Sequence, residues 1–367
     1  MAAKPAPGGS GEIASVVLLM CIGVVMHPSQ IAGGGFAKVS PDGPINGADF
    51  VQAGGVRAVV DAMANHAAHN AELAERTCQM LTAVVHEEPR LTAAKGTEKA
   101  HAAGAVAQIV SAMSAHPAVA TLQAHAARTL VNLVGTGVRP NPEYVRIMTL
   151  AGALQLLLCA LDNHAGSRDV CRDVLRALGN MCTQWLGPLR TDAQEDILCT
   201  IARAAIKAAG EHAASAAVCG NAALVLVNMS AFDAVEAGGI SALDKVIGLG
   251  GGVKVACSVL RDHLGDSDVV SKALVLLGNA TAKGFHPVVC QHGGQELVRK
   301  ALKTHPRNQT IQDYANRALA LLELKGDARQ RVRQQQDADT AARGGLRNVE
   351  VHYGNHEAGG GVDLCKS

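Results

Sequence analysis

Apolar residues recur along this chain with helical spacing, and the whole pattern repeats about every 48 residues. The clearest copy runs from Gln123 to Val134 and ends in an apolar residue, any residue, an asparagine and another apolar residue. The same ending returns three more times, which places four asparagines 48, 48 and 51 residues apart: Asn132, Asn180, Asn228 and Asn279. A fixed period of this length predicts an array of stacked helical repeats.

A histidine precedes each of these asparagines by 16 residues, and the same frame extends to both sides. The six histidines are His66, His116, His164, His212, His263 and His305. The first unit then has Thr82 at the Asn position and the last has Leu321, which gives six units from about residue 44 to about residue 326. Stacked helices lie about 8–10 Å apart, so one histidine per layer cannot share a metal ion. We interpret each histidine as closing the second helix of its unit, where it interacts with the C-terminal carbonyls.

The residues two before and one after the Asn position are apolar in all six units. They are Met80, Leu130, Leu178, Leu226, Leu277 and Leu319, and Ala83, Leu133, Met181, Met229, Ala280 and Leu322. A spacing of three residues puts both columns on one helix face, which we expect to be buried. The Asn position lies about 130° from the centre of that face, so we expect its side chains to point away from the core. The position four before it should join them on an open face: Cys78, Arg128, Arg176, Leu224, Val275 and Arg317.

Glycines suggest the plan of each unit, which is a short leading helix, a turn and two longer helices. A glycine allows the positive φ angle that a sharp turn between helices requires. In the fifth unit two glycine pairs compete, and we choose Gly251–Gly252 because it stands at the same distance from its histidine as the pair of the first unit. This choice predicts a leading helix over 241–249. The fourth unit lacks such a pair, and its loop is expected near Ala209–Gly210.

The two ends of the chain break the pattern. Residues 1–48 are expected to form a disordered start, a degenerate capping helix at about 12–26 and a Gly/Pro-rich loop or broken unit. The apolar run Ile13 to Met26 is too short to span a bilayer, which takes about 20 residues, and Glu12 adjoins it, so we favour a helix over a signal peptide. Residues 49–326 form the predicted array, and residues 327–367 a helix extension followed by a disordered tail.

Composition narrows the classes of function. Hydrophobic residues make up 48% of the chain and aromatic residues only 2%, so the core must consist of Ala, Val, Leu and Met. The 33 basic and 32 acidic residues nearly cancel, which argues against electrostatic binding to nucleic acid or to a membrane. The ten cysteines show no metal-ligand spacing and are interpreted as small buried residues in a reducing compartment. The glycine run from Gly248 to Lys254 lacks the pattern of a phosphate-binding loop. We therefore expect neither a cofactor, a metal nor an enzyme.

The sequence resembles armadillo repeats, over about three quarters of the chain. The resemblance rests on Gly-Gly-Val-Arg-Ala-Val-Val at 54–60, the loop that begins Ala-Met-Ser-Ala-His-Pro at 112–117, and Thr-Leu-Val-Asn-Leu at 129–133. It implies an all-α, right-handed α-solenoid of three-helix repeats, in which the third helices line a concave groove. In several members an Asn of that helix holds the backbone of an extended peptide. The nuclear-import adaptors of the family also carry a Trp four residues before the Asn, and this chain has its only Trp at Trp185.

By this resemblance the peptide groove would contain Arg128, Asn132, Arg176, Asn180, Asn228, Asn279 and Arg317. The arginines favour a ligand with acidic side chains or phosphoserine. The expected function is a non-enzymatic protein-interaction scaffold that binds an extended, acidic peptide segment. The alternative is a structural subunit of a larger assembly, for example cytoskeletal or ciliary. The expected compartment is the cytoplasm, with the cytoskeleton and the nucleus as alternatives.

Overall fold

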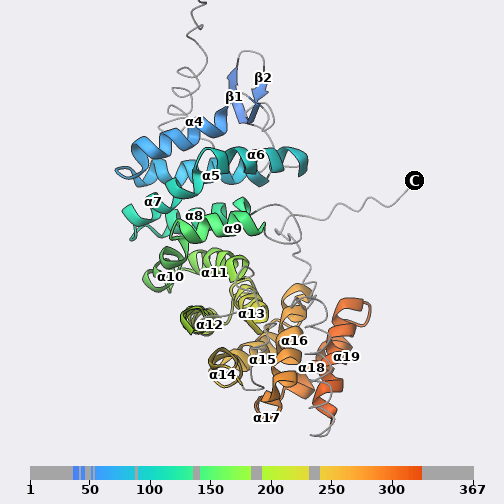
Figure 1. Cartoon of the computed structure of the whole chain (residues 1–367). Helices are drawn as coiled ribbons and strands as arrows, with labels where there is room; N and C mark the ends of the chain where they lie inside the picture. Colours follow the sequence, from blue (N-terminus) through green and yellow to red (C-terminus); the bar gives the residue numbers. More distant parts are fainter. Residues whose placement is uncertain are drawn as a thin grey trace, which may run out of the picture.

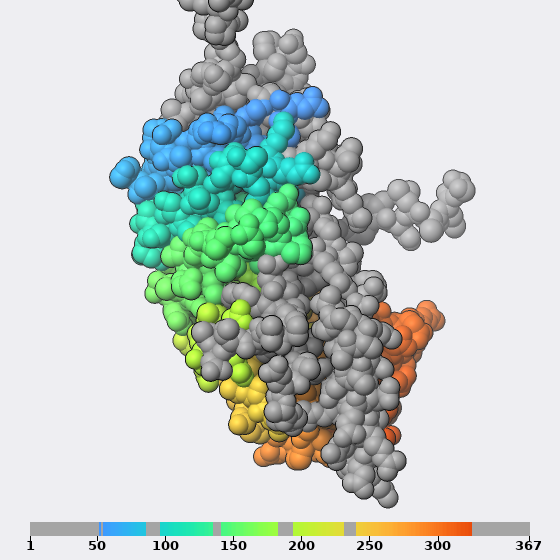
Figure 2. All heavy atoms as spheres, in the orientation of Figure 1, coloured from blue at the N-terminus to red at the C-terminus, as the bar shows by residue number. Residues whose placement is uncertain are grey.

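The computed structural model describes residues 36–40, 43–45, 51–52, 54–86, 90–134, 141–182, 192–230 and 240–324. Within these ranges the chain is helical apart from one two-stranded hairpin. Figure 1 shows the helices stacked one after another along an elongated, curved body. Figure 2 shows the same order on the surface, where successive layers follow each other from blue to orange. The predicted helix at about 12–26 and the predicted tail from 327 lie outside the described residues.

The helices form six layers that follow the predicted units. The leading helices are α6 (Arg90–Ala102), α9 (Pro142–Leu150), α14 (Ala242–Gly248) and α17 (His286–Gln291). The second helices are α4 (Gly55–Ala62), α7 (Ala105–Ala115), α10 (Ala153–Asn163), α15 (Gly252–Asp262) and α18 (Gly294–Thr304). The third helices are α5 (Ala71–His86), α8 (Ala120–Leu133), α11 (Arg168–Cys182), α13 (Ala216–Ser230), α16 (Ser267–Ala280) and α19 (Gln309–Glu323). Two π-helical segments, η1 (Met63–Ala67) and η3 (Thr281–Phe285), continue α4 and α16.

Glycine marks the turn before each of the five separate second helices. The residue at the N-terminal end of each has a positive φ angle: Gly54, Gly104, Gly152, Gly251 and Gly293. The choice of Gly251 in the fifth unit is confirmed, and α14 occupies the predicted leading helix. Ser241 caps α14 in a capping box with Asp244, which explains why this helix begins there.

The fourth layer has no such glycine, and its first two helices are fused into one. This helix, α12 (Asp192–Glu211), runs without interruption to the turn before α13. The prediction of a loop near Ala209–Gly210 is therefore wrong, because both residues are helical and the turn begins after Glu211. A chain that lacks a residue suited to positive φ continues its helix instead.

The region predicted as a loop before residue 49 contains a hairpin. Strands β1 (Phe36–Ser40) and β2 (Gly43–Ile45) pair in antiparallel fashion, with Phe36 opposite Ile45 and Ser40 opposite Gly43. The sequence between them, Ser-Pro-Asp-Gly, is a typical turn sequence. This local signal should have predicted the hairpin.

The two apolar columns of the third helices form the core, as predicted. Nine of their twelve side chains are buried, and those of the central layers are completely so. The three that are only partly buried, Met80, Ala83 and Leu319, belong to the first and last layers. Burial thus increases toward the middle of the array, as expected when each layer is supported by its neighbours.

Two further stripes on the third helices join one layer to the next. Residues ten, six and three before the Asn position face the preceding layer, and residues eight, five and one before it face the following layer. Gly220 of α13 illustrates the fit, because a Cβ atom there would meet the Val269 side chain of α16 at 3.0 Å. At Gly179 of α11 the fit is looser, because a Cβ atom there would meet Val225 of α13 at 3.6 Å, an ordinary contact. Small residues therefore set how closely the helices approach.

The outer faces of the first and last layers are polar at these same positions. The stripe toward the preceding layer is buried throughout layers 2 to 6, whereas in layer 1 it carries polar residues: Glu72, Arg76 and Gln79. In layers 1 to 5 the position five before the Asn is buried: Thr77, Ala127, Leu175, Ala223 and Leu274. In layer 6 the same position is the exposed Asn316, next to the exposed Asp313 and Ala320. The third helices of the six layers therefore end in polar faces on both sides.

The histidine column forms a ladder between the layers. Each of the last five histidines donates its Nε2–H to the carbonyl oxygen of the residue that follows the histidine of the preceding layer. The pairs are His116 to Ala67 (2.6 Å), His164 to Pro117 (2.8 Å), His212 to Ala165 (2.6 Å), His263 to Ala213 (2.7 Å) and His305 to Leu264 (2.6 Å). A carbonyl oxygen only accepts, so Nε2 carries the proton in each ring.

The rings of these histidines bind a different partner from the one that the sequence predicted. The backbone N–H of each does bind the end of its own second helix, for example from His116 to the Ala112 oxygen at 3.1 Å. The imidazole ring, however, does not contact the carbonyls of that helix and instead reaches the neighbouring layer. Helix spacing alone does not reveal in which direction a side chain leaves the end of its helix.

Replacing His212 with alanine should cost about 1 kcal/mol of stability, the usual net value of a hydrogen bond, because the Ala165 oxygen loses its donor. His66 is the matched control, since it is exposed and has no described preceding layer to bind. His66→Ala should change stability by less than about 0.5 kcal/mol. Urea denaturation followed by circular dichroism measures both, and equal losses would contradict a role between layers.

Candidate protein-binding face

The third helices lie side by side in chain order, each in contact with the next, and they present polar side chains along one face. We call this surface the third-helix face and define it by the Asn positions and the residues four and seven before them, together with Arg172, which stands eight before Asn180 and binds Asp173. The residues seven before the Asn position form a column that was not predicted from the sequence: Glu75, His125, Asp173, Asn221, Lys272 and Tyr314. Seven residues are close to two helical turns, so this polar column could have been found from its spacing.

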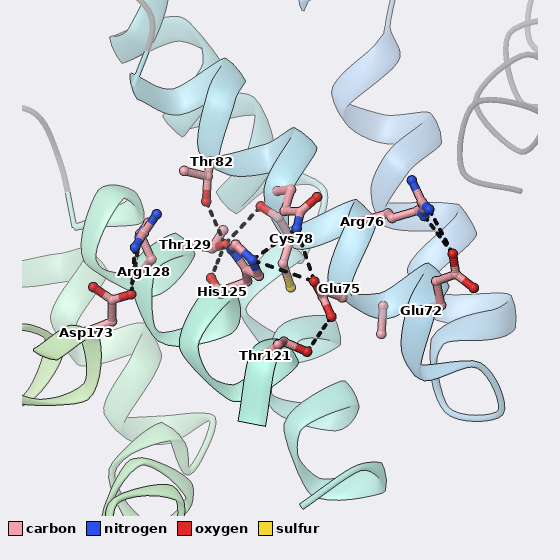
Figure 3. A network of polar contacts seen from close by, with 12 residues as sticks. Glu72, Glu75, Arg76, Cys78, Thr82, Thr121, His125, Arg128, Thr129 and Asp173 are labelled. Carbon is pink, nitrogen blue, oxygen red and sulfur yellow. Dashed lines mark hydrogen bonds and ion pairs between the residues drawn. The ribbon is translucent and has the colours of Figure 1, made fainter. Parts of the chain in front are cut away.

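Layers 1 and 2 are joined by a polar network around His125, drawn in Figure 3. Thr121 of α8 donates its hydroxyl to Glu75 Oε2 of α5 at 2.6 Å. Gln79 donates from Nε2 to Glu75 Oε1 at 3.2 Å and also lies 3.0 Å from His125 Nε2. The Glu75 carboxylate itself stands 3.6 Å from His125 Nε2. With the ring neutral, Nε2 accepts from Gln79, so this network fixes the ring without needing its charge.

A thiol, an imidazole and a carboxylate occur together in this network, but they form no nucleophilic relay. Cys78 is fully buried, and burial raises the pKa of its thiol to about 12. Its neighbour is the Thr129 hydroxyl, which donates to the carbonyl oxygens of Cys78 and His125 at 3.0 and 2.7 Å. Cys78 therefore lacks the thiolate that a nucleophile requires.

Layers 2 and 3 are joined by a carboxylate held between two arginines. Asp173 of α11 is 6% exposed and accepts from Arg128 Nε and Nη2 of α8 at 3.2 and 3.0 Å. Arg172 approaches the same carboxylate from its own helix at 2.8 Å to each oxygen and also binds Asp169 at 2.8 Å. The side chains of Arg128 and Arg172 remain 35% and 27% exposed. Asp173 thus orients two arginines whose outer edges still face solvent.

The four asparagines do not form a uniform open row. Asn132 and Asn228 are partly exposed, whereas Asn180 and Asn279 are buried. Asn228 donates from Nδ2 to the Gly179 oxygen of the preceding layer at 3.0 Å, and Asn279 donates to Ser230 Oγ at 2.9 Å. The expectation that all four point away from the core is therefore wrong. Asn180 and Asn279 are buried, and the side chains of Asn228 and Asn279 bind the preceding layer.

The residues four before the Asn position also differ in burial from layer to layer. Cys78, Leu224 and Val275 are buried, which contradicts the expectation of a continuous open column. Arg176 is partly exposed and Arg317 is exposed, and both make polar contacts. The arginines with accessible charge therefore gather in layers 2 and 3, with Arg317 apart in layer 6.

Burial lowers the pKa of two histidines in layer 2, His101 and His125. His101 of α6 stacks on Tyr144 of α9 with ring centroids 3.8 Å apart and lies with Nε2 2.7 Å from the Leu133 oxygen. Its Nδ1 is buried without a hydrogen-bond partner among the described residues. Desolvation lowers the pKa of His101 and of His125, and the Leu133 carbonyl and the Glu75 carboxylate oppose this only in part.

Stability should therefore fall as the pH is lowered below about 6.5, the ordinary histidine pKa, because the unfolded chain then binds protons that the folded rings resist. The urea midpoint measured between about pH 7.5 and 5 should show this slope. His101→Phe keeps an aromatic ring beside Tyr144 and removes the titrating group, so its slope should be shallower. His69→Asn, at an exposed site, is the control. An unchanged slope in His101→Phe would show that this ring is not responsible.

The described residues contain no group of three or more His, Cys, Asp or Glu side chains arranged to hold a metal ion. The eight described cysteines are free thiols, and six of them are buried. No single described helix is both long and apolar enough to cross a membrane, although α9 and α10 together meet that test as a pair bent by 72°. Of the described cysteines, only Cys159 and Cys290 are exposed.

Comparison with known proteins supports the fold. No model of a protein family matches the sequence, and no curated protein matches it. The structure is similar to an engineered protein from a structural genomics consortium, with a TM-score of 0.58 and 19% identity over 93% of this chain and 71% of the other. It is also similar to a chain from a structure concerned with a phosphorylation switch in the interaction between cadherin and β-catenin. There the TM-score is 0.56 at 15% identity, over 81% of this chain and 49% of the other, so this chain spans about half of that protein. At these identities the likeness shows a helical, solenoid-like fold.

Proposed function

We propose that this chain is a non-enzymatic protein-interaction scaffold, an armadillo-type right-handed α-solenoid whose third-helix face binds an extended, acidic segment of another protein. The observation that carries the proposal is the pair of oriented, partly exposed arginines in layers 2 and 3, Arg128 and Arg172. Asn132 follows Arg128 by four residues on α8; it is partly exposed and makes no side-chain hydrogen bond within the described residues. The proposal includes no cofactor, nucleic acid or lipid surface, and it places the protein in the cytoplasm.

Side-chain charge has to supply most of the affinity. A hydrogen bond to a peptide backbone contributes about 1 kcal/mol net, and micromolar binding requires about 8 kcal/mol. The donors of Asn228 and Asn279 are already used within the array, which leaves Asn132 as the clearest backbone contact. Guanidinium groups form bidentate bonds with carboxylates and phosphates, and these are the stronger, charge-assisted kind. The site in layers 2 and 3 therefore fits an acidic or phosphorylated side chain next to a backbone amide.

Cross-linking in native extract, followed by mass spectrometry, would identify the partner and the residues that it contacts. The variant Arg128→Gln with Asn132→Ala should then weaken binding about tenfold or more, because charge-assisted bonds contribute about 1.5–3 kcal/mol. Glutamine is chosen because a glutamate would place a second carboxylate beside the buried Asp173, which Arg172 continues to hold. Arg57→Gln, on the second helix of layer 1, is the control and should leave affinity within about twofold.

The alternative, a structural subunit of a larger assembly, predicts a different result. Such a subunit buries several faces, so cross-links would be spread over second and third helices alike. Binding would then be insensitive to Arg128→Gln with Asn132→Ala. That combination would overturn the proposed peptide-binding function.

A further inference from the structure

The second helices carry very different charges at the two ends of the array. In layers 1 to 3, α4 has one basic and one acidic residue, α7 has no charge, and α10 has one aspartate. In layers 4 to 6, residues 199–211 of α12 together with α15 and α18 carry seven basic residues and three acidic ones. This leaves +4 on these second-helix segments, in a chain whose total charge is only +1. The first part of α12, in the place of a leading helix, adds three acidic residues, Asp192, Glu195 and Asp196.

Most basic side chains on the second helices of layers 4 to 6 have no ion pair, although Arg299 of α18 pairs with Glu323 at 3.0 Å, and Lys272 and Lys283 are paired on other segments. In layers 1 to 3 the ion pairs include Arg57–Asp61, Arg76–Glu72, Arg128–Asp173, Arg146–Glu143 and Arg172–Asp169. On the second helices of layers 4 to 6, five exposed basic residues have no acidic partner within the described parts of the chain: Arg203, Lys254, Arg261, Lys300 and Lys303. Lys207 stands 3.7 Å from Asp162 and remains 56% exposed. The basic side chains on the second helices of layers 4 to 6 are therefore accessible to a partner.

These residues occupy repeated positions on helices that touch. Arg203 and Lys254 stand nine residues before the histidine of their layer, Lys207 and Lys300 five before, and Arg261 and Lys303 two before. Helix α12 contacts α15, and α15 contacts α18, so their side chains form one surface. Packed helices lie about 8–10 Å apart, so the three columns extend across three layers. Their other positions hold Gly210, Ser258 and the acidic Glu296. We call the six basic residues of these columns the basic ridge.

We propose that the basic ridge binds an acidic segment of a protein, separately from the third-helix face. Two other polyanions fit less well. The three helices of the ridge contain no aromatic residue on which nucleic-acid bases could stack. The large apolar side chains that are exposed among the described residues, Leu150, Ile240 and Leu249, lie on other segments, so the ridge itself has no group to insert into a lipid surface. An acidic protein segment needs only the cluster of exposed basic side chains.

A labelled peptide of about ten glutamates spans roughly three layers at ~3.3 Å per residue and serves as the probe. Its binding to the full chain is measured by fluorescence anisotropy at low and at physiological ionic strength, since salt screens exposed charges. The test variant is Lys254→Gln with Lys300→Gln and Lys303→Gln. The matched control is Ala107→Glu with Ser111→Glu and Gln155→Glu, which places the same change in net charge at exposed, equivalent positions of layers 2 and 3.

The ridge variant should lose about tenfold in affinity, since each exposed ion pair accounts for a factor of roughly two to three. The control should stay within about twofold, and circular dichroism should show both variants folded. Equal losses would mean that only net charge matters and would overturn the proposal. So would the absence of binding by the unmodified chain, or binding to anionic vesicles or duplex DNA in preference to the peptide. Arg128→Gln is measured in parallel, and a loss of probe binding in that variant but not in the ridge variant would assign the probe to the third-helix face and overturn the proposal.

Discussion

Leu178→Ala should lower the free energy of unfolding by about 2–5 kcal/mol, the range measured for large-to-small changes in buried cores. Leu178 is completely buried in α11, with layers packed on both sides, so the cavity it leaves cannot be filled by a rearranging surface. Its counterpart Leu319 is partly buried in the last layer, and Leu319→Ala should cost clearly less. Urea unfolding of both variants measures the difference, and equal losses would contradict a stack in which neighbours support each layer.

Gly248→Ala should destabilise the protein by about 1–3 kcal/mol or more, through overpacking. A Cβ atom at Gly248 would overlap the ring of Phe285, which is buried in the connection between layers 5 and 6. That connection also contains the buried ion pair of Lys283 with Asp244 at 2.5 Å, so the ring cannot easily move aside.

Gly210→Ala is the matched control for this prediction. Gly210 is a helical, exposed residue, and a Cβ atom added to it would have no other group within 4 Å. Alanine there should stabilise the chain by about 0.5–1 kcal/mol, because glycine is a poor helix former. The two glycine substitutions should therefore shift the thermal midpoint in opposite directions. A shift of the same sign and size would show that the Phe285 contact is not tight.

The sequence predicted the layers well because their signals are local. A column of Leu178 and its equivalents, a glycine before each second helix and a histidine after it can all be read within one unit. The hairpin was not predicted, and the loop of the fourth unit was placed inside α12. Each feature departs from the repeat, so the other units do not indicate it. Gly251 shows the value of the frame, because distance to His263 decided between two glycine pairs.

The third-helix face was predicted less well, for a geometric reason. A helical wheel assumes one buried side, but a third helix inside the stack touches its own second helix and both neighbouring layers. Its exposed arc is therefore narrow, and positions such as Leu224 and Val275 fall outside it. The partners of Asn228 and Arg128 lie 49 and 45 residues away, and the register between layers that brings them together is not contained in the spacing of one unit.

The polar outer faces of layers 1 and 6 affect where a further layer can be added to such an array. A layer duplicated between layers 3 and 4 would meet small and apolar side chains on both sides, with Arg172 as the charged exception, so insertion in the middle is compatible with the packing. The same layer fused after layer 6 would place its apolar stripe against Asp313 and Asn316, and one fused before layer 1 would meet the Glu72–Arg76 ion pair. Desolvating those charges opposes end-to-end stacking, which is the contact that open filaments require. Lengthening by internal duplication is therefore open to this fold, whereas stacking another layer on the described outer faces of the third helices of layers 1 and 6 is disfavoured.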